Sequence, residues 1–316
     1  MTRYGLTTIL ILGGMGNIFN ILIFSRKQSR STSCSLYLSA ASVLNLLSLS
    51  IGIISSDYAV DHINPETYWL IYCKLRLYFL HASLMMGRCY LMLACIDRCT
   101  LCSPLTKIRK FSQVKIARRL APAVVIICFV ISMHIPVFNT IQQQRCVMPA
   151  SYGLIYSIYS LLVAGLLPPL TMGVAGILTY KNLRHIRQRI QPVGMVDSSR
   201  LRIRRRDYQI MIMLMVQVIV YIISTTAYPV NLFYTTLTAN IVKNADRQAI
   251  EKFLGFMAAG FLIYLNAASP FYIYYFTSAT FRQDMKRLLT NCGLIFNITI
   301  SQTGTNRLDA TENNTL

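Results

Sequence analysis

Seven long apolar stretches constrain the fold of this chain more than any other feature of its sequence. The hydrocarbon core of a bilayer is about 30 Å thick and requires roughly 20 residues of helix, so each stretch is long enough to cross it. Six of the seven contain no Asp, Glu, Lys or Arg. Lipid offers the backbone no hydrogen-bond partner, so such stretches are expected to be helical. We therefore predict an all-α membrane protein, a bundle of seven transmembrane helices at 4–24, 36–56, 75–96, 120–138, 153–180, 210–235 and 253–277.

The charged residues predict the orientation of this bundle. Most of the 31 Lys and Arg residues lie in four polar segments that would share one side of the membrane, 25–35, 97–119, 181–209 and 278–316. These segments hold 23 basic and six acidic residues, a net charge of +17, whereas the opposite side holds seven basic and five acidic residues, a net charge of +2. Basic residues in short loops mark the cytoplasmic side, so we expect the N-terminus outside and the C-terminus inside.

The same charges indicate which partners to expect. A net charge of +20 is also found in proteins that bind nucleic acid. Here the basic residues flank apolar spans instead of covering one face of a soluble domain, so we expect no nucleic-acid partner. Arg204, Arg205 and Arg206 are expected to contact the anionic lipid of the inner leaflet, and they are also available to a cytosolic partner.

The domain organisation follows from the same pattern. We predict one transmembrane domain over 1–290 and a disordered cytoplasmic tail over 291–316, which is polar and rich in Asn and Thr. No set of His, Cys and carboxylate residues has the spacing of a metal site or a catalytic triad, so we expect no enzyme, no metal and no cofactor.

Two of the nine cysteines predict a disulfide bond. The other seven lie in spans or on the reducing side, whereas Cys73 and Cys146 fall outside, where a disulfide bond persists. Cys73 begins the third span and Cys146 lies in the loop after the fourth. A bond between them would hold that loop over the outer mouth of the bundle.

The third span ends in an Asp97-Arg98 pair. Arg98 follows Cys73 by 25 residues, about 37 Å of helix, which places the pair at the inner mouth of the bundle. One interpretation is that the two charges neutralise each other in a closed bundle and that Arg98 extends to a partner in an open one. The other is an ordinary interfacial ion pair in which Arg98 snorkels to water.

In their order and spacing, these features resemble the rhodopsin-like (class A) G-protein-coupled receptors, and most closely the invertebrate neuropeptide receptors. The resemblance covers residues 4–290. It rests on Gly16-Asn17, the pattern from Leu38 to Leu47, Cys73 with Cys146, Asp97-Arg98-Cys99, Pro168 or Pro169, Pro229, and the run from Asn266 to Arg282. In the seventh span Ser269-Pro270 offers a second alignment, but the distance to Phe281-Arg282 favours the one that makes Tyr274 the switch tyrosine.

The resemblance implies a function and partners. It implies a plasma-membrane receptor that transmits the binding of an extracellular ligand to a heterotrimeric G protein, with the cytoplasmic mouth opening outward. Asp97, Arg98 and Tyr274 would form the switch. A short amphipathic helix would follow the seventh span, and Cys292 would be palmitoylated.

Several residues depart from the family pattern. Asn45 replaces the usual Asp, which puts a sodium site in doubt, and Cys99 replaces the usual Tyr. Gln209 stands where some members carry an acid that pairs with the Arg of the third helix. We therefore expect a weak inner contact and elevated basal signalling.

Residue types near the outer mouth restrict the ligand. Leu80 occupies the position where amine receptors need an Asp, and the span 253–277 has no Lys for a retinal Schiff base. Aromatic residues with charges of both signs suit a peptide instead. We predict ligand contacts from Asp57, Arg76, His81, Asn231, Tyr234, Phe256 and Tyr264. Asp57 would meet a basic group of the peptide, while Asp61 and Glu66 are expected to be solvated loop charges.

Arg88 is the charged residue buried deepest in a predicted span. It precedes Arg98 by ten residues, roughly 15 Å of helix, and at that depth an Arg costs roughly 2.5–3.5 kcal/mol on insertion scales. We predict that it organises a polar layer with Asn17, Asn45 and Asn266 that rearranges on activation.

Two alternatives remain open. A chemosensory receptor of the same fold for a small molecule would fit the relaxed motifs. A transporter would favour paired ionisable groups within the membrane or internal repeats, and we find one such Arg and no repeat.

Overall fold

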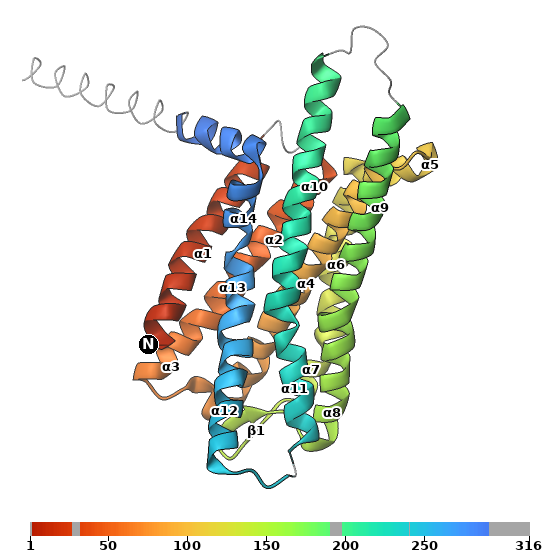
Figure 1. The fold of residues 1–316 in the computed structure, drawn as a ribbon. Coiled ribbons are helices and arrows are strands. Elements are labelled where there is room, and N and C mark those ends of the chain that lie inside the picture. The colour runs from red at the N-terminus through yellow and green to blue at the C-terminus, as the bar shows by residue number, and fades with distance from the viewer. Residues whose placement is uncertain (1, 27–31, 190–197, 240, 291–316) are drawn as a thin grey trace, which may run out of the picture.

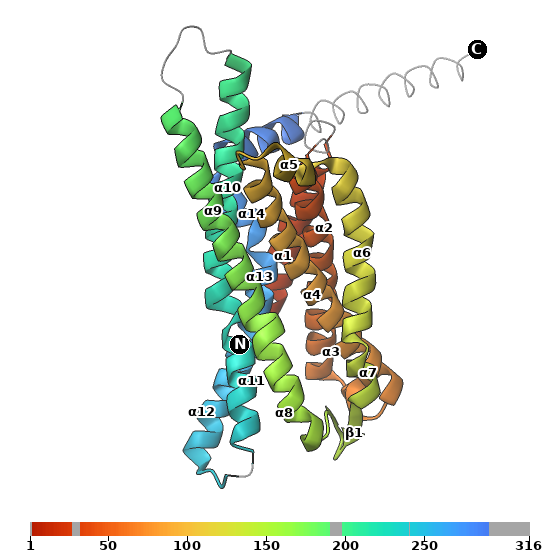
Figure 2. The same cartoon turned by 90° about the vertical axis from the view of Figure 1, so that its right-hand side faces the viewer.

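The computed structural model describes residues 2–26, 32–189, 198–239 and 241–290. Within these residues seven helical spans are long and apolar enough to cross a membrane, as predicted. They run side by side as one bundle (Figures 1 and 2). The predicted tail 291–316, with Cys292, lies outside the described residues, and so do the side chains of Arg204, Arg205 and Arg206.

The spans are made of the following elements, in chain order. The first four are α1 (Thr2–Phe24); α2 (Ser33–Leu49), η1 (Ser50–Ile54) and α3 (Ser55–Asp61); α4 (Leu70–Leu101); and α6 (Val114–Ser132) with α7 (His134–Phe138). The last three are α8 (Ala150–Tyr159), η4 (Ser160–Leu166) and α9 (Leu167–Arg189); α10 (Ser198–Thr225) with α11 (Ala227–Leu237); and α12 (Ala245–Gly255), η5 (Phe256–Leu262), α13 (Ile263–Ala268) and α14 (Pro270–Thr277). Short turns η2 (Pro65–Thr67), α5 (Thr106–Arg109) and η3 (Lys110–Ser112) lie between spans.

Prolines account for several of the interruptions. The α10–α11 break at Thr226 lies three residues before Pro229, and Pro270 is the first residue of α14. A proline removes a backbone donor and its ring clashes with the preceding turn, so the helix is interrupted just before it. The α6–α7 break at Met133, three residues before Pro136, has the same cause.

Three wider turns were not predicted. The segments η1, η4 and η5 are π-helical, with backbone hydrogen bonds that span one more residue than those of an α-helix. Such segments are rare and often lie at functional sites. All three lie toward the end of the bundle that carries Cys73, which we call the outer end; the end that carries Arg98 is the inner end.

A β-hairpin lies over the outer end. Strands β1 (Thr140–Gln142) and β2 (Arg145–Val147) pair antiparallel, with Ile141 opposite Cys146. The turn residues Gln143 and Gln144 have φ of 48° and 55°, as a two-residue hairpin turn requires. The predicted disulfide bond joins Cys146 to Cys73 at the start of α4 with a Cα–Cα distance of 5.8 Å, so the hairpin is tied to the bundle.

The inner half of the bundle has a well-packed core. The rings of Phe24, Tyr274 and Phe281 lie 5.8 to 5.9 Å apart, and the ring of Tyr37 in α2 stacks on that of Tyr90 in α4. Helices in lipid associate through close packing of this kind, because lipid tails are as apolar as the side chains themselves. Residues 279–290 form the short helix predicted after the seventh span, and it lies across the inner end (Figure 1).

Candidate functional site

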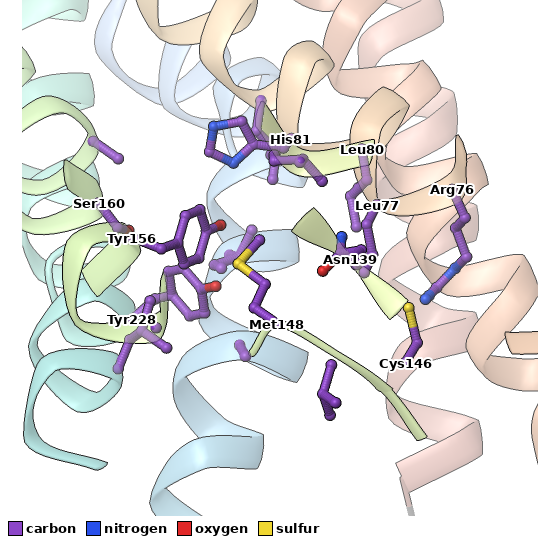
Figure 3. A pocket seen from close by; sticks show the side chains of 18 of the residues that line it. Arg76, Leu77, Leu80, His81, Asn139, Cys146, Met148, Tyr156, Ser160 and Tyr228 are labelled. Carbon is purple, nitrogen blue, oxygen red and sulfur yellow. The ribbon is translucent and has the colours of Figure 1, made fainter. Parts of the chain in front are cut away.

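A cavity of about 530 Å³ opens at the outer end of the bundle. Its walls come from α4, α7, the β-hairpin, α8, η4, α11, η5 and α13, so each of the last five spans contributes (Figure 3). Ligand pockets in proteins commonly have volumes of about 300–1,000 Å³ and combine apolar walls with a few polar groups. The size and the mixed lining are those of a site for a small ligand or for one end of a larger ligand.

The charged residues that line the outer cavity are basic. Arg76 and Arg88 line it, and none of the described lining residues is Asp or Glu. Arg76 is already compensated, because it forms an ion pair with Glu66 and donates hydrogen bonds to Ser55 Oγ (2.5 Å) and the Gly52 carbonyl (3.3 Å). Glu66, predicted to be a solvated loop charge, is therefore half-buried against Arg76, and that prediction was wrong.

Hydrogen-bonding side chains line the same cavity. The phenol rings of Tyr156 and Tyr228 lie side by side with their hydroxyls directed inward (Figure 3). Asn139 and Ser160 are only 2% and 1% exposed. Asn139 Nδ2 and Ser160 Oγ are nevertheless without a hydrogen-bond partner among the described residues. A buried donor in this state is costly, so the cavity is suited to a ligand that carries acceptors.

Arg88 lies at the floor of the outer cavity and is 9% exposed. Its guanidinium carbon is 5.9 Å from the centre of the Tyr221 ring, and its Nη1 donates to Met85 Sδ at 3.9 Å. Tyr221 is itself held by a 2.8 Å hydrogen bond from its hydroxyl to the Ala164 carbonyl of η4. The structure therefore places the Arg88 charge against an aromatic face, with no carboxylate beside it among the described residues.

A second, smaller cavity begins below Arg88. It has a volume of about 40 Å³ and is lined by Leu84, Arg88 and Ile263, which also line the outer cavity, and by Asn45, Gln217, Asn266 and Tyr274 among others. A water molecule needs about 10–15 Å³, so this inner cavity has room for water between its polar groups. Three members of the predicted polar layer, Asn45, Arg88 and Asn266, meet here.

Asn17, the fourth member, has a different position. Its Nδ2 donates to the Gly13 carbonyl of its own helix (2.8 Å) and to the Ala267 carbonyl of α13 (3.0 Å). It therefore joins α1 to α13 and does not line the inner cavity. Both protons of Nδ2 are used in these two bonds, whereas Oδ1 has no partner among the described residues.

The Asp97-Arg98 pair is buried at the inner end, with 5% and 3% of the two residues exposed. Arg98 donates to Asp97 Oδ2 from Nε (3.1 Å) and Nη2 (2.6 Å). The other carboxylate oxygen accepts hydrogen bonds from Ser112 Oγ (2.7 Å) and from Ser33 Oγ. A snorkelling Arg98 would reach water instead, so the geometry is that of a closed inner mouth.

Gln209 forms a further contact at the inner end. Its Oε1 accepts hydrogen bonds from the Thr280 backbone N–H (2.9 Å), the Thr280 hydroxyl and Ser278 Oγ (3.3 Å). These bonds join α10 to the turn after α14. Tyr274 is buried beside this turn, between Phe24 and Phe281.

The predicted ligand residues divide into two groups. Arg76, His81 and Tyr264 line the outer cavity, whereas Asp57, Asn231, Tyr234 and Phe256 do not. Asp57 accepts a hydrogen bond from Thr7 of α1 (3.1 Å). Tyr234 interacts with Glu251 (3.1 Å) and Arg247 (2.8 Å) of α12. These side chains join neighbouring helices, so this cavity lends no support to their role as ligand contacts.

Five polar residues of the cavity wall were not singled out in the sequence, namely Asn139, Tyr156, Ser160, Tyr228 and Thr236. Tyr152, Tyr156 and Tyr159 recur at the spacing of one helix face, which is a signal for part of this set. Asn139 reaches the cavity only because the hairpin folds over the outer end. The predicted disulfide bond indicates that this loop covers the outer mouth, but no residue pattern singles out Asn139.

Comparison with known proteins agrees with the geometry. Residues 16–274 match the model of the family described as 7 transmembrane receptor (rhodopsin family). A search of curated proteins found no match. The family match covers more than half of the chain and includes both cavities, the buried Asp97-Arg98 pair and Tyr274. The chain therefore belongs to the rhodopsin family of seven-transmembrane receptors.

Proposed function

We propose that this receptor couples the binding of an extracellular peptide to the activation of a heterotrimeric G protein at the plasma membrane. Receptors of this family transmit signals across the membrane and are generally not enzymes. The observation that carries the proposal is the shared boundary of the two cavities. The outer cavity ends at Arg88, and the inner cavity that begins there extends to Tyr274.

In the proposed coupling, the signal passes from the outer cavity through Arg88 to the inner cavity. A ligand in the outer cavity would contact Arg88 and the neighbouring wall of α11. A shift of these groups would change the shape of the inner cavity, which Asn45, Asn266 and Tyr274 also line. Because Arg88 and Arg98 are ten residues apart on α4, the signal has roughly 15 Å of helix to cross before it reaches the inner mouth.

Activation is then a shift between two populations. In the closed form Asp97 holds Arg98 and Gln209 holds the turn after α14. A ligand that binds the open form more tightly moves the equilibrium toward it by its difference in affinity. In the open form Arg98 leaves Asp97 and contacts the G protein. The breaks before Pro229 and Pro270 are the points where α10 and α14, the inner parts of their spans, can swing.

The inner surface is the proposed docking site. It carries the net charge of +17 predicted for the cytoplasmic segments. Arg98, Tyr274 and the basic residues of 181–209 are the proposed contacts, with some of the latter also at anionic lipid. We place the receptor domain at 1–290 and the cytoplasmic tail at 291–316, with palmitoylation at Cys292 as a further proposal.

The outer cavity and the hairpin support a peptide that inserts one end. The hairpin at the mouth offers backbone groups to a longer ligand, and about 530 Å³ accommodates a few terminal side chains. A small molecule of a chemosensory kind would fill the same volume. A ligand screen therefore includes both classes.

The test is guanine-nucleotide exchange by purified G proteins on the full chain in lipid nanodiscs. Asp97→Asn removes the charge that holds Arg98 and is expected to raise basal exchange, whereas Arg98→Ala removes the contact itself and is expected to abolish exchange. Breaking a buried ion pair commonly costs about 3–5 kcal/mol, so both variants are compared at equal amounts of folded receptor. Arg145→Ala, on the exposed outer hairpin, is the control. Exchange that survives Arg98→Ala would contradict the proposal.

A further inference from the structure

We propose that the floor of the outer cavity is an anion subsite, in which a carboxylate group of the ligand pairs with Arg88. The inference rests on the proposed function, because it takes the outer cavity as the ligand site. It also reverses the expectation drawn from the sequence, in which Asp57 would meet a basic group of a peptide.

The first argument is the charge balance of the cavity. Arg88 is 9% exposed, and none of the described residues that line the outer or the inner cavity is Asp or Glu. Its aromatic neighbour Tyr221 stabilises a cation through its ring face, but more weakly than a carboxylate does. A buried cation is costly unless it is paired, so an anion at this floor would be held strongly.

The second argument is where the outer carboxylates lie. Glu66 pairs with Arg76, and Asp57 accepts a hydrogen bond from Thr7. Glu251 is bound by Lys243 (2.5 Å) and by Arg247 (3.0 Å). Glu66 and Glu251 are thus committed to ion pairs, whereas Asp57 Oδ1 is buried without a partner among the described residues. None of these three acids lines the outer cavity, so none is placed to receive the ammonium or guanidinium group of a ligand there.

The third argument is the excess of donors on the cavity wall. Asn139 Nδ2 and Ser160 Oγ are buried and have no partner among the described residues. The hydroxyls of Tyr156 and Tyr228 are directed into the same space, where they hydrogen-bond to each other and leave one O–H to donate (Figure 3). A ligand with acceptor oxygens satisfies these donors, and a carboxylate offers two oxygens with several acceptor positions.

The depth of the subsite indicates how the ligand enters. Arg76, near the disulfide bond, and Arg88 are 12 residues apart on α4, about 18 Å of helix. An extended peptide covers about 3.4 Å per residue, so roughly five residues reach from the hairpin to the floor. The carboxylate would thus be the free C-terminus of a peptide that inserts that end first, or the head group of a small organic acid.

Matched pairs of ligands separate acid recognition from general binding. We would use pools of five-residue peptides prepared both as free C-terminal acids and as C-terminal amides. Octanoate with octanamide and 3-phenylpropionate with its amide test the small-acid source. The readouts are the thermal unfolding midpoint and the apparent affinity of the full chain in nanodiscs. Wild-type receptor is expected to prefer acid over amide by about 30-fold or more, as for a buried charge pair that loses one partner.

Variants at Arg88 assign that preference to its side chain. Arg88→Gln keeps a similar size and is expected to bring the ratio of acid to amide affinity close to one. Arg88→Lys keeps the charge without the forked geometry, so it is expected to retain a reduced preference and also shows that the site tolerates substitution. Arg145→Gln removes an exposed charge of the outer hairpin and is expected to leave the ratio unchanged.

Each result decides the proposal. The proposal is supported if wild-type receptor prefers acids, Arg88→Gln loses that preference and Arg88→Lys keeps part of it. Binding by the peptide pools or by the small acids then identifies which of them carries the carboxylate. Equal affinity for acids and amides, no binding by any acid of the two arms, or a preference that survives Arg88→Gln overturns it.

Nucleotide exchange distinguishes this proposal from the proposed function. Acids that bind through Arg88 without promoting exchange on any G protein would leave the anion subsite intact and contradict the coupling role. Ligands that promote exchange through Arg98 and bind equally well to Arg88→Gln would contradict the anion subsite and leave the coupling role intact.

Discussion

The outer and inner halves of the bundle differ in what their polar groups contact. In the outer half, beside a cavity of about 530 Å³, Asn139 Nδ2 and Ser160 Oγ have no partner among the described residues. In the inner half Asp97 and Gln209 accept hydrogen bonds from several side chains at once. The outer half thus presents unpartnered donors to a cavity, whereas Asp97 and Gln209 at the inner end are bonded within the bundle.

The helix geometry of the backbone also differs between the outer and inner halves. The π-helical segments η1, η4 and η5 all lie in the outer half, where η4 and η5 line the cavity and the Gly52 carbonyl of η1 binds Arg76. The described inner half contains no π-helical segment, and aromatic rings pack around Tyr274. Wider turns supply space and reorient side chains, at the expense of regular hydrogen bonding. Regular packing gives a well-defined closed state.

Removal of the disulfide bond is expected to have the largest effect, and it acts on the outer half of the bundle. Cys73→Ser frees the hairpin from α4, and loss of a native disulfide bond typically costs about 2–5 kcal/mol, so we expect a much lower unfolding midpoint and reduced delivery to the cell surface. Cys99→Ser changes a free cysteine of the same helix in the inner half and is the control. Equal surface levels and equal midpoints for the two variants would show that the outer half does not depend on the hairpin.

Two glycines of one span test the close approach of η4 to α11. A Cβ at Gly165 would lie 2.9 Å from Pro229 Cγ, whereas at Gly173 no atom lies within 4 Å. Overpacking of this kind costs about 1–3 kcal/mol, so Gly165→Ala is expected to lower the unfolding midpoint, while Gly173→Ala leaves it unchanged or raises it slightly. The measurement is thermal unfolding of both variants in the same nanodiscs. A lower unfolding midpoint for Gly173→Ala, with the midpoint of Gly165→Ala unchanged, would contradict the close approach of η4 to α11 at Gly165.

Substitution of Gln209 is expected to have the smallest effect, and this effect is confined to the inner half of the bundle. Gln209→Leu removes the acceptor for Ser278 and Thr280, a loss of about 1 kcal/mol, and is expected to raise basal nucleotide exchange several-fold because the closed state is destabilised. Gln209→Glu keeps an acceptor and serves as the comparison. Basal exchange of Gln209→Leu at the wild-type level would mean that this bond does not hold the inner half closed. The elevated basal signalling expected for the unmodified chain stays a prediction that the same assay addresses.

Much of the architecture could be predicted because lipid imposes it. The seven spans, the Cys73–Cys146 bond and the helix at 279–290 agree with the prediction. The hairpin escaped prediction because its turn is Gln143-Gln144 and lacks the glycine or asparagine that usually marks positive φ. The π-helical segments escaped it because their cause lies in contacts between helices rather than in a local residue pattern.

The candidate site could be predicted only in part. Arg76, His81 and Tyr264 line the outer cavity, but Asp57 and Tyr234 contact neighbouring helices instead. The physical reason is that lipid and protein interior are equally apolar. Hydropathy therefore locates a span along the membrane normal but does not determine its rotation about its own axis.

By itself the sequence determined how many times the chain crosses the membrane, which end faces inward and which cysteines pair, since backbone hydrogen bonding, charge and redox compartment decide these locally. It also showed that Arg88 is a charge within a span. Only the tertiary structure decided that Arg88 divides two cavities, faces Tyr221 and has no carboxylate beside it among the described residues. That arrangement depends on how seven helices rotate against one another, and this rotation is set by packing that no single stretch of sequence contains.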